Sequence, residues 1–312
     1  LVDATKRNGQ SFAQDPAATA KATVGGVLAT ARSGPLRLSQ GTPRDHALGL
    51  EMVTGDGRVL NVGGRVVKNV AGYDLVRLLV GSAGTLGLIT GAYLRLKPIP
   101  QADTTIAVTA DSAEALIEVA ERVMTEMLEA AAMELLAPHS SATEWTLLVR
   151  LTGNEDAVAD AHARIGAFGG DMRSSQADAW QQVQNLELQA MTTVRLADLP
   201  TRLSPTLQVA QKLAARAGTS ARLAAHAGDG IVRVHLGAEP VPLGAALVVL
   251  DATLLAPHLA LGPPALAFLV VHVRPSSSAA ASSGPIRPSA SWRRISLRRS
   301  ASASRSGSTS VW

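Results

Sequence analysis

The sequence contains no cysteine. This absence excludes disulfide bonds, thiolate metal sites and a cysteine nucleophile, and it suits a reducing compartment. Aromatic residues make up only 3% of the 312 residues, whereas hydrophobic residues make up 46%. We therefore expect cores built from small aliphatic side chains, in a chain long enough for two or three domains.

Acidic residues are missing from residues 252–312, which carry seven arginines. Because the whole chain has a formal net charge of +4, residues 1–251 carry −3. The basic character therefore belongs to the C-terminal segment, and we expect no nucleic-acid partner for the rest of the chain.

Long hydrophobic runs are also absent. The apolar stretch 241–273 is interrupted by Asp251, Pro257, His258, Pro263 and Pro264. It therefore falls short of the roughly 18–20 consecutive apolar residues of a membrane span. After residue 275 the sequence is dominated by Ser, with Arg, Ala and Pro, and this composition predicts a disordered tail. The first residues, LVDATKRNGQ, lack a signal-peptide pattern and read as the middle of a domain.

Composition divides the chain into residues 1–100, 101–240 and 241–312. The first part predicts a hairpin around residues 55–57, a short helix after Asp74 and a strand within 86–100. The second part predicts strands at 104–110 and 144–153, helices over 112–128 and 154–170, and a strand–turn–strand unit at 221–236. The expected fold class is α+β, with an antiparallel sheet in the second part and a low-complexity tail.

Two glycine motifs stand out in the first part. Gly25 and Gly26 are adjacent, which would let backbone amides approach a phosphate or a flavin edge; a simple loop is an equal alternative. The segment GSAGTLG, residues 81–87, repeats glycine every third residue. It is neither a dinucleotide fingerprint nor a P-loop, because no clear helix follows and the Lys-Ser/Thr pair is missing. Neither motif alone identifies a function.

Several segments together resemble a known family: ATVGG (22–26), GTPRDHALGLEMVTGDGRVL (41–60), GGRVVKNVAGYDLVRLLVGSAGTLGLIT (63–90) and LRLKP (94–98). They resemble vanillyl-alcohol-oxidase-type flavoproteins, which have a PCMH-type FAD-binding domain, and most of all the FAD-binding (E) subunit of bacterial glycolate oxidase. The resemblance implies that residues 1–100 are the second half of an FAD-binding domain and 101–240 a cap domain. It implies FAD as the cofactor.

The resemblance also implies which residues hold FAD. Residues 23–26 match a segment beside the pyrophosphate, 30–33 a stretch that faces the flavin, and 84–87 a turn against the cofactor. Asp45 falls near the site, with a turn-capping carboxylate as an equal alternative, and Lys68 and Asn69 are either structural or near the flavin. The cofactor-binding candidates are Thr23, Val24, Gly25, Gly26, Thr30, Ala31, Arg32, Ser33, Asp45, Gly84, Thr85, Leu86, Gly87 and Ile89.

A third motif, HAGDG at 226–230, resembles the His-x-Gly-Asp-Gly-Asn-x-His signature of D-2-hydroxyacid dehydrogenases, in which two histidines help to hold a metal or the substrate. Here Ile231 replaces the Asn and Arg233 stands where the second His belongs, so we expect no metal. The substrate-binding candidates are His226 and Arg233, the latter through a bidentate pair with a carboxylate. Alternatively, AGDG is a hairpin turn, His226 a strand residue and Arg233 a surface residue.

The function that the resemblance implies is that of an FAD-dependent oxidoreductase subunit in a glycolate oxidase complex. It would oxidise a 2-hydroxy acid, glycolate to glyoxylate, by hydride transfer to FAD. The partners would be a second flavoprotein subunit and an iron–sulfur subunit, in the cytoplasm or peripherally at the inner face of the membrane. The alternatives are a non-catalytic assembly subunit with a vestigial FAD fold and a stand-alone FAD-dependent D-2-hydroxyacid dehydrogenase.

Two features of the family are not found. A glycine-rich loop that wraps the pyrophosphate would come before residue 1, and a segment like FDP…NPGRF would follow the cap domain. We therefore expect this chain alone to bind FAD weakly and to be inactive, because each lost hydrogen bond to phosphate costs about 1.5–3 kcal/mol. Our hypothesis is that residues 241–312 are read out of frame; a native disordered or membrane-surface tail is the alternative.

Overall fold

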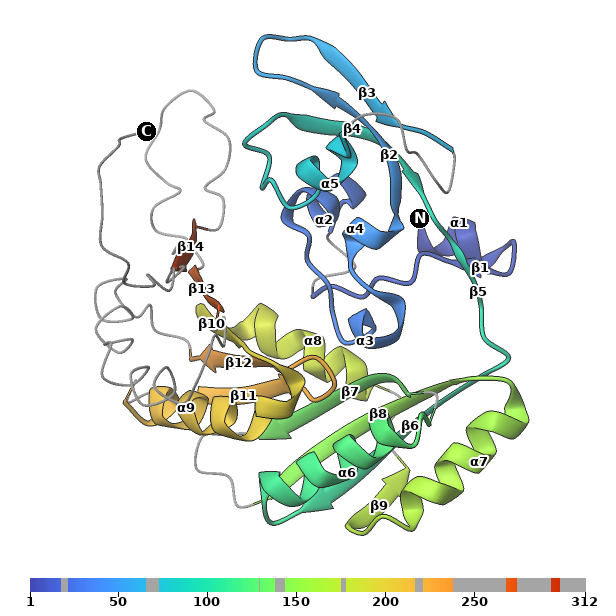
Figure 1. Cartoon of the computed structure of the whole chain (residues 1–312), viewed down its shortest axis with the longest axis vertical. Helices are drawn as coiled ribbons and strands as arrows, with labels where there is room; N and C mark the ends of the chain where they lie inside the picture. Colours follow the sequence, from blue (N-terminus) through green and yellow to red (C-terminus); the bar gives the residue numbers. More distant parts are fainter. Residues whose placement is uncertain are drawn as a thin grey trace, which may run out of the picture.

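The computed structural model describes residues 1–17, 22–65, 73–128, 130–137, 144–174, 178–216, 221–237, 268–273 and 293–297. Residues 66–72 of the glycine-rich motif, with Lys68 and Asn69, lie outside these ranges. Two main sheets, one small and one large, stand one above the other (Figure 1). Both are antiparallel and carry helices, so the predicted α+β class is confirmed.

The small sheet has three strands in the order β3-β2-β4. They are β2 (Ala47–Val53), β3 (Val59–Gly63) and β4 (Leu88–Leu94). The predicted hairpin is confirmed, because the Thr54 amide donates to the Arg58 carbonyl (3.0 Å) and Gly57 turns the chain with a φ of +83°. A further pair of short strands, β1 (Gln10–Ser11) and β5 (Lys97–Pro98), joins the two ends of this part of the chain.

Three short helices pack on the small sheet: α2 (Val24–Thr30), α4 (Pro43–His46) and α5 (Leu75–Leu79). Two more belong to this part of the chain: α1 (Val2–Lys6) packs on β1, and α3 (Arg37–Gln40) packs on the large sheet. The predicted N-cap of α5 is confirmed, since the Asp74 carboxylate accepts from the Arg77 amide at 3.0 Å. The core between the helices and the sheet consists of Leu28, Leu50, Met52, Val76, Leu79 and Val80.

The large sheet has nine strands in the order β14-β13-β10-β12-β11-β7-β8-β6-β9. Their bounds are β6 (Ala102–Ala110), β7 (Ala130–Ala137), β8 (Trp145–Gly153), β9 (Asp171–Ser174), β10 (Thr192–Ala197), β11 (Ala221–His226), β12 (Ile231–Leu236), β13 (Phe268–Val273) and β14 (Arg293–Leu297). Strand β14 lies within the segment after residue 275 whose composition predicts disorder, and β13 lies in the apolar stretch 241–273 before it. The other residues of 238–312 lie outside the described ranges.

Three helices cover one face of the large sheet: α6 (Ala113–Thr125), α7 (Glu155–Gly166) and α9 (Leu203–Arg216), the last preceded by a 3₁₀ turn, η1 (Pro200–Arg202). The opposite face carries α8 (Ala179–Gln189), whose Ala179 and Val183 pack on Leu148. Because side chains alternate along a strand, Val232 and Val234 of β12 join the helix-covered core and Arg233 projects to the other face. That second face is the one turned toward the small sheet (Figure 1).

The predicted helices over 112–128 and 154–170 and the predicted strands at 104–110, 144–153 and 221–236 all form, with ends that differ by a few residues. Within residues 101–240, the described elements that come without prediction are β7, β9, β10, α8, α9 and η1. Among the described residues, no helix combines the length and apolar character needed to cross a bilayer.

Candidate functional site

The second glycine motif, residues 81–87, lies against the C-terminal end of α2, the helix whose first turn contains Gly25 and Gly26. The helix ends at Ala31, which adopts a φ of +50°. Two carbonyl groups in the last turn of the helix accept hydrogen bonds from the 81–87 segment. The Gly81 amide donates to the Leu28 carbonyl (3.0 Å), and the Ala83 amide donates to the Ala29 carbonyl (2.7 Å). The turn 81–87 is thereby fixed against residues 30–33.

Gly25 and Gly26 lie in the first turn of α2, so the interpretation as a simple loop is wrong. Thr23 caps the helix, with its Oγ1 accepting from the Gly26 amide at 3.0 Å. A Cβ on Gly26 would lie only 2.9 Å from that oxygen. Glycine is therefore required there for space rather than for a positive φ. The helix escapes sequence analysis because seven residues with two glycines give little helical periodicity.

A pocket of about 310 Å³ lies between the helices of the small sheet and the exposed face of the large sheet. Such a volume is at the lower end of small-molecule sites, which span about 300–1,000 Å³. It contains all four residues expected to face the flavin. Its lining consists of Thr30, Ala31, Arg32, Ser33, Arg37, Thr42, Arg44, Ala83, Glu187, Thr193, Arg195, Ile231 and Arg233.

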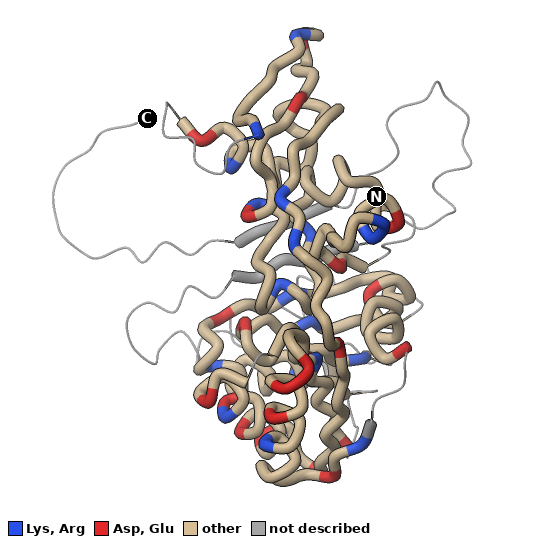
Figure 2. Tube along the Cα trace, turned by 90° about the vertical axis from the view of Figure 1, so that its right-hand side faces the viewer, with Lys and Arg blue, Asp and Glu red and all other residues tan. Residues whose placement is uncertain are grey.

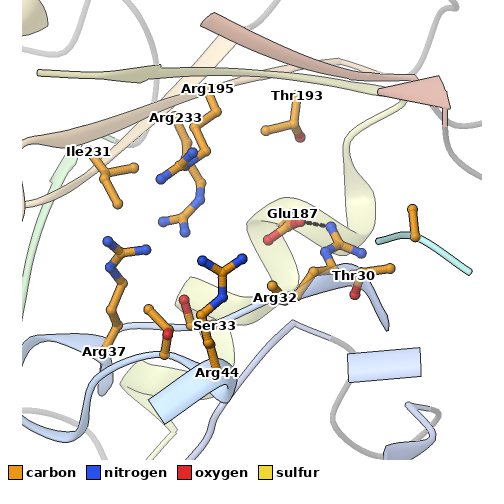
Figure 3. Close-up of a pocket in the computed structure, with 13 residues that line it drawn as sticks. Thr30, Arg32, Ser33, Arg37, Arg44, Glu187, Thr193, Arg195, Ile231 and Arg233 are labelled. Carbon is orange, nitrogen blue, oxygen red and sulfur yellow. Dashed lines mark hydrogen bonds and ion pairs between the residues drawn. The ribbon is translucent and has the colours of Figure 1, made fainter. Parts of the chain in front are cut away.

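Five of these lining residues are arginines, against one carboxylate. Arg37 and Arg44 come from α3 and α4 below, and Arg195 and Arg233 from β10 and β12 above; all four guanidinium groups point into the same space (Figure 3). Figure 2 likewise shows basic positions gathered where the two parts of the molecule meet. Arginine binds carboxylates and phosphates through paired hydrogen bonds, so the pocket suits an anion.

Arg195 and Arg233 are direct cross-strand partners in the register of β10 and β12. Directly opposite side chains in an antiparallel pair lie close together, and like charges in such positions repel each other. Both residues are only partly exposed, which weakens the screening of that repulsion by water. An anion between the two guanidinium groups would relieve the repulsion.

Two ion pairs hold the walls of the pocket together. Arg32, just beyond α2, pairs with Glu187 of α8 (Figure 3), and Arg37 pairs with Asp229 of the β11–β12 turn at 3.3 Å. Both partners of the first pair are largely buried. The pairs therefore fix Arg32 and Arg37, in the N-terminal part of the chain, relative to the elements of the large sheet.

Behind Arg233 lies a buried cluster of titratable groups. A guanidinium N–H of Arg233 donates to His226 Nε2, and Glu134 Oε2 lies 3.7 Å from the same nitrogen. Burial raises the pKa of Glu134 to about 8, and Arg233 only partly offsets this rise. Burial, with the charge of Arg233, holds the pKa of His226 well below its ordinary value. Near neutral pH both groups are uncharged, and Arg233 keeps its positive charge.

The arrangement decides between the alternatives for HAGDG. Residues 227–230 form a hairpin turn between β11 and β12, and His226 is a strand residue, buried beneath Arg233. The interpretation of Arg233 as a surface residue is wrong, because its side chain lines the pocket. His226 accepts from Arg233 through Nε2, so the tautomer carries its proton on Nδ1 and Nε2 cannot act as a base. In the described part of the chain, no three metal-ligating side chains gather.

The other cofactor candidates occupy different positions. Asp45 accepts from the Thr42 amide (2.8 Å) and hydroxyl (2.7 Å) in a capping box at the start of α4. Gly84, Thr85 and Leu86 are exposed beside the lining residue Ala83. Gly87 has no space for a Cβ, which would collide with Met52 and Val53. Further candidates are half-buried and do not line the pocket: Val24, Gly25 and Ile89. Val24 and Ile89 pack against the core of the small sheet.

Sequence analysis misses several residues of the pocket: Arg37, Arg44, Thr193, Arg195, Glu187 and Ile231. Only Arg44 has a usable signal, since it stands beside Asp45 in the family segment GTPRD. Arg195 is recognised as a site residue only through its pairing with Arg233, which lies 38 residues further along the chain. The sequence alone does not give the register of these two strands.

Comparisons with known proteins agree with the resemblance found in the sequence. Residues 1–63 match the model of the FAD binding domain family. The chain is 32% identical over 259 residues to a D-lactate dehydrogenase from Archaeoglobus fulgidus, covering 75% of this chain and 58% of that protein. It is 37% identical over 168 residues to glycolate oxidase subunit GlcE from Escherichia coli, covering 54% and 44%.

A third relative is glycolate oxidase subunit GlcD from Bacillus subtilis, 35% identical over 44% of this chain and 29% of that protein. The chain thus spans about half or less of the length of these relatives. Among solved structures, alkyldihydroxyacetonephosphate synthase matches 82% of this chain and 56% of its own, with a TM-score of 0.62 and 16% identity; this match concerns the fold alone. The chain therefore carries part of a PCMH-type FAD-binding domain, and FAD is the cofactor indicated.

The pocket fits such a cofactor. Positive charge near a flavin ring tunes its electronics, and the pyrophosphate also needs cationic or N–H partners. Residues 30–33, Ala83 and the arginines provide polar and cationic walls at one end of α2. Residues 23–26 lie at the other end, roughly 10 Å away at 1.5 Å per helical residue. The two segments that the resemblance assigns to FAD binding, residues 23–26 and 30–33, therefore lie at the two ends of helix α2.

Proposed function

We propose that the chain is part of an FAD-dependent oxidoreductase that converts a 2-hydroxy acid into the 2-oxo acid, as the FAD-binding subunit of a glycolate oxidase complex. The observation that carries the proposal is the arginine-lined pocket at the meeting point of the FAD-domain segment and the cap sheet. The similarity to glycolate oxidase subunits GlcE and GlcD supports the assignment to a complex.

Each wall of the pocket has a separate role. Residues 30–33 and the 81–87 turn hold the flavin side of the cofactor, and Thr23–Gly26 the side toward the phosphates. When bound, FAD would supply the acceptor for the hydride that leaves C2 of the acid, while the 2-hydroxyl group would lose its proton to solvent as C2 becomes the oxo carbon. Arg195 and Arg233 hold the substrate carboxylate through bidentate hydrogen bonds and so orient C2 toward the flavin wall.

The partners that we propose are a second flavoprotein subunit and an iron–sulfur subunit, which would carry the electrons onward. We place the complex in the cytoplasm, with at most peripheral attachment to the inner face of the membrane. A second candidate is a D-lactate dehydrogenase that acts without partners, because the match to the Archaeoglobus fulgidus enzyme extends over 75% of the chain.

A flavin titration tests the proposal. The purified chain is titrated with FAD, and binding is followed by fluorescence quenching; glycolate or D-lactate is then added without oxygen, and bleaching of the flavin absorbance is recorded. Bleaching by either acid supports the oxidoreductase. Bleaching that requires co-purified subunits favours the complex, whereas bleaching of the isolated chain by D-lactate favours the second candidate. FAD that binds but is reduced by neither acid would refute the proposed reaction.

A further inference from the structure

We propose that the arginine pocket binds a dianionic 2-hydroxy acid, one with a second carboxylate, in preference to a monocarboxylic acid of the same length with an alkyl end. One carboxylate lies between Arg195 and Arg233, and the second between Arg37 and Arg44. The inference rests on the proposed function for the role of the first carboxylate, and it adds the class of substrate.

The first argument is that two separate pairs of arginines face each other. Arg195 and Arg233 project from neighbouring strands of the large sheet, whereas Arg37 and Arg44 project from α3 and α4 of the other part of the chain (Figure 3). One carboxylate has two oxygens and is satisfied by a single bidentate partner or a single pair. Four convergent guanidinium groups exceed what one carboxylate can use.

The second argument is the charge balance of the pocket wall. Glu187 is the one acidic lining residue, and it pairs with Arg32. Asp229 lies 3.3 Å from Arg37, and its charge also acts on Arg195 and Arg233. The charge of Asp15 acts on Arg233 as well, so two carboxylates offset part of the charge of the four arginines. Glu134, behind Arg233, is uncharged near neutral pH because burial raises its pKa to about 8. The wall thus retains more than one positive charge for a ligand.

The third argument is the scarcity of apolar lining. Beside the arginines, most lining side chains are hydroxyl groups or single methyl groups, and Ile231 is the one large aliphatic lining residue. A monocarboxylic acid with an alkyl end would bury that end among polar groups, which is unfavourable. Arg44 reaches the pocket from an exposed position, where it donates to the Val80 carbonyl at 3.2 Å, and can turn toward a second carboxylate.

The test uses two acids of equal length that differ only in the end group: D-malate, which has a second carboxylate, and D-2-hydroxybutyrate, which has a methyl group. Calorimetric titration of the 312-residue chain at low salt, with and without FAD, measures both affinities. We expect malate to bind at least about tenfold more tightly, since each 1.4 kcal/mol is a factor of ten. Equal affinities would overturn the proposal.

Two variants locate the second carboxylate. In Arg44→Gln we expect the affinity for malate to fall close to that for 2-hydroxybutyrate, while the affinity for 2-hydroxybutyrate itself stays the same. The matched control is Arg58→Gln, an exposed arginine that pairs with Asp56 in the β2–β3 hairpin and should change neither affinity. Circular dichroism checks that both variants fold. If either variant fails to fold, the comparison of malate and 2-hydroxybutyrate binding to the wild-type chain tests the proposal on its own.

A competition experiment separates this inference from the proposed function. If ADP displaces malate and its own binding weakens in Arg44→Gln, the arginines hold cofactor phosphates and the proposal is wrong. If malate binds tightly but the flavin is not reduced, the dianion site stands and the proposed reaction fails. If the flavin is reduced equally by both acids at equal affinity, the reaction stands and the substrate class is wrong.

Discussion

Glu134 is completely buried in β7, and neither of its carboxyl oxygens has a hydrogen-bond partner among the described residues. Its pKa is raised from 4.5 to about 8, chiefly by burial. The folded chain therefore binds more protons than the unfolded chain between these values. Stability is greatest below about pH 4.5 and falls as the pH rises through 8. The lowered pKa of His226 has the opposite effect, but below about pH 6.5.

We therefore predict that the free energy of unfolding decreases between pH 7 and 8, by up to about 1.4 kcal/mol per pH unit. Glu134→Gln replaces the protonated acid with a neutral group of the same shape, and its stability should be nearly constant over this interval. Urea unfolding at several pH values measures both slopes. Glu118→Gln, an exposed position on α6, should keep the wild-type slope; a wild-type slope in Glu134→Gln would show that another group titrates.

Substitutions at Gly84 and Gly57 can be compared to distinguish a loss of stability from a loss of cofactor binding. Both have a positive φ, +75° and +83°, and in both cases a Cβ would meet nothing within 4 Å. Alanine at either position should therefore cost a similar amount of stability, about 1–2 kcal/mol for the left-handed backbone. Only Gly84 neighbours the pocket, through Ala83.

We predict that Gly84→Ala lowers the flavin occupancy of the purified protein, whereas Gly57→Ala leaves it unchanged at the same loss of stability. Flavin absorbance per protein and thermal unfolding are measured on the same samples. Equal occupancy in the two variants would show that the turn 81–87 does not contact FAD.

At the scale of elements, α2 depends on one hydrogen bond at its start. The Thr23 hydroxyl accepts from the Gly26 amide, and a Cβ at residue 26 would crowd that oxygen at 2.9 Å. We predict that Thr23→Ala and Gly26→Ala each destabilise the chain by about 0.5–2 kcal/mol, as the loss of an N-cap does. Because both remove the same bond, the double variant should cost little more than either single one. Additive losses in a denaturant series would contradict this mechanism.

The elements that the sequence predicts are those with a local signal. Helix α6 has an N-cap at Ser112 and apolar residues at helical spacing, and the β2–β3 hairpin has its glycine turn. Strand β7, AAAMELLA, is buried on both faces and so shows no alternation of polar and apolar residues. Helix α2 is too short for a periodic pattern. The family segments identify residues 30–33, but the partners across the pocket depend on the register and packing of distant strands.

At the scale of the whole molecule, the pocket exists because two parts of the chain are held together. Ser39 of α3 donates to the Ala131 carbonyl of β7 at 2.9 Å, and Arg32 pairs with Glu187 of α8. The same contacts that join the parts also set the charge of the pocket. Glu187 is the one acidic residue that lines the pocket. Its ion pair with Arg32 joins the two parts of the chain, and its negative charge lowers the positive potential in the pocket.

We therefore predict opposite effects of Glu187→Gln on stability and on anion binding. The loss of a partly exposed ion pair should lower the free energy of unfolding by up to about 1 kcal/mol. The loss of one negative charge should strengthen malate binding several-fold at low salt, and added salt should reduce the gain. Glu118→Gln, on the helix-covered side of the large sheet, removes the same charge at a distance and should change neither. If Glu187→Gln weakens malate binding, the ion pair is needed to keep the arginines in place, and their geometry rather than the net charge determines affinity.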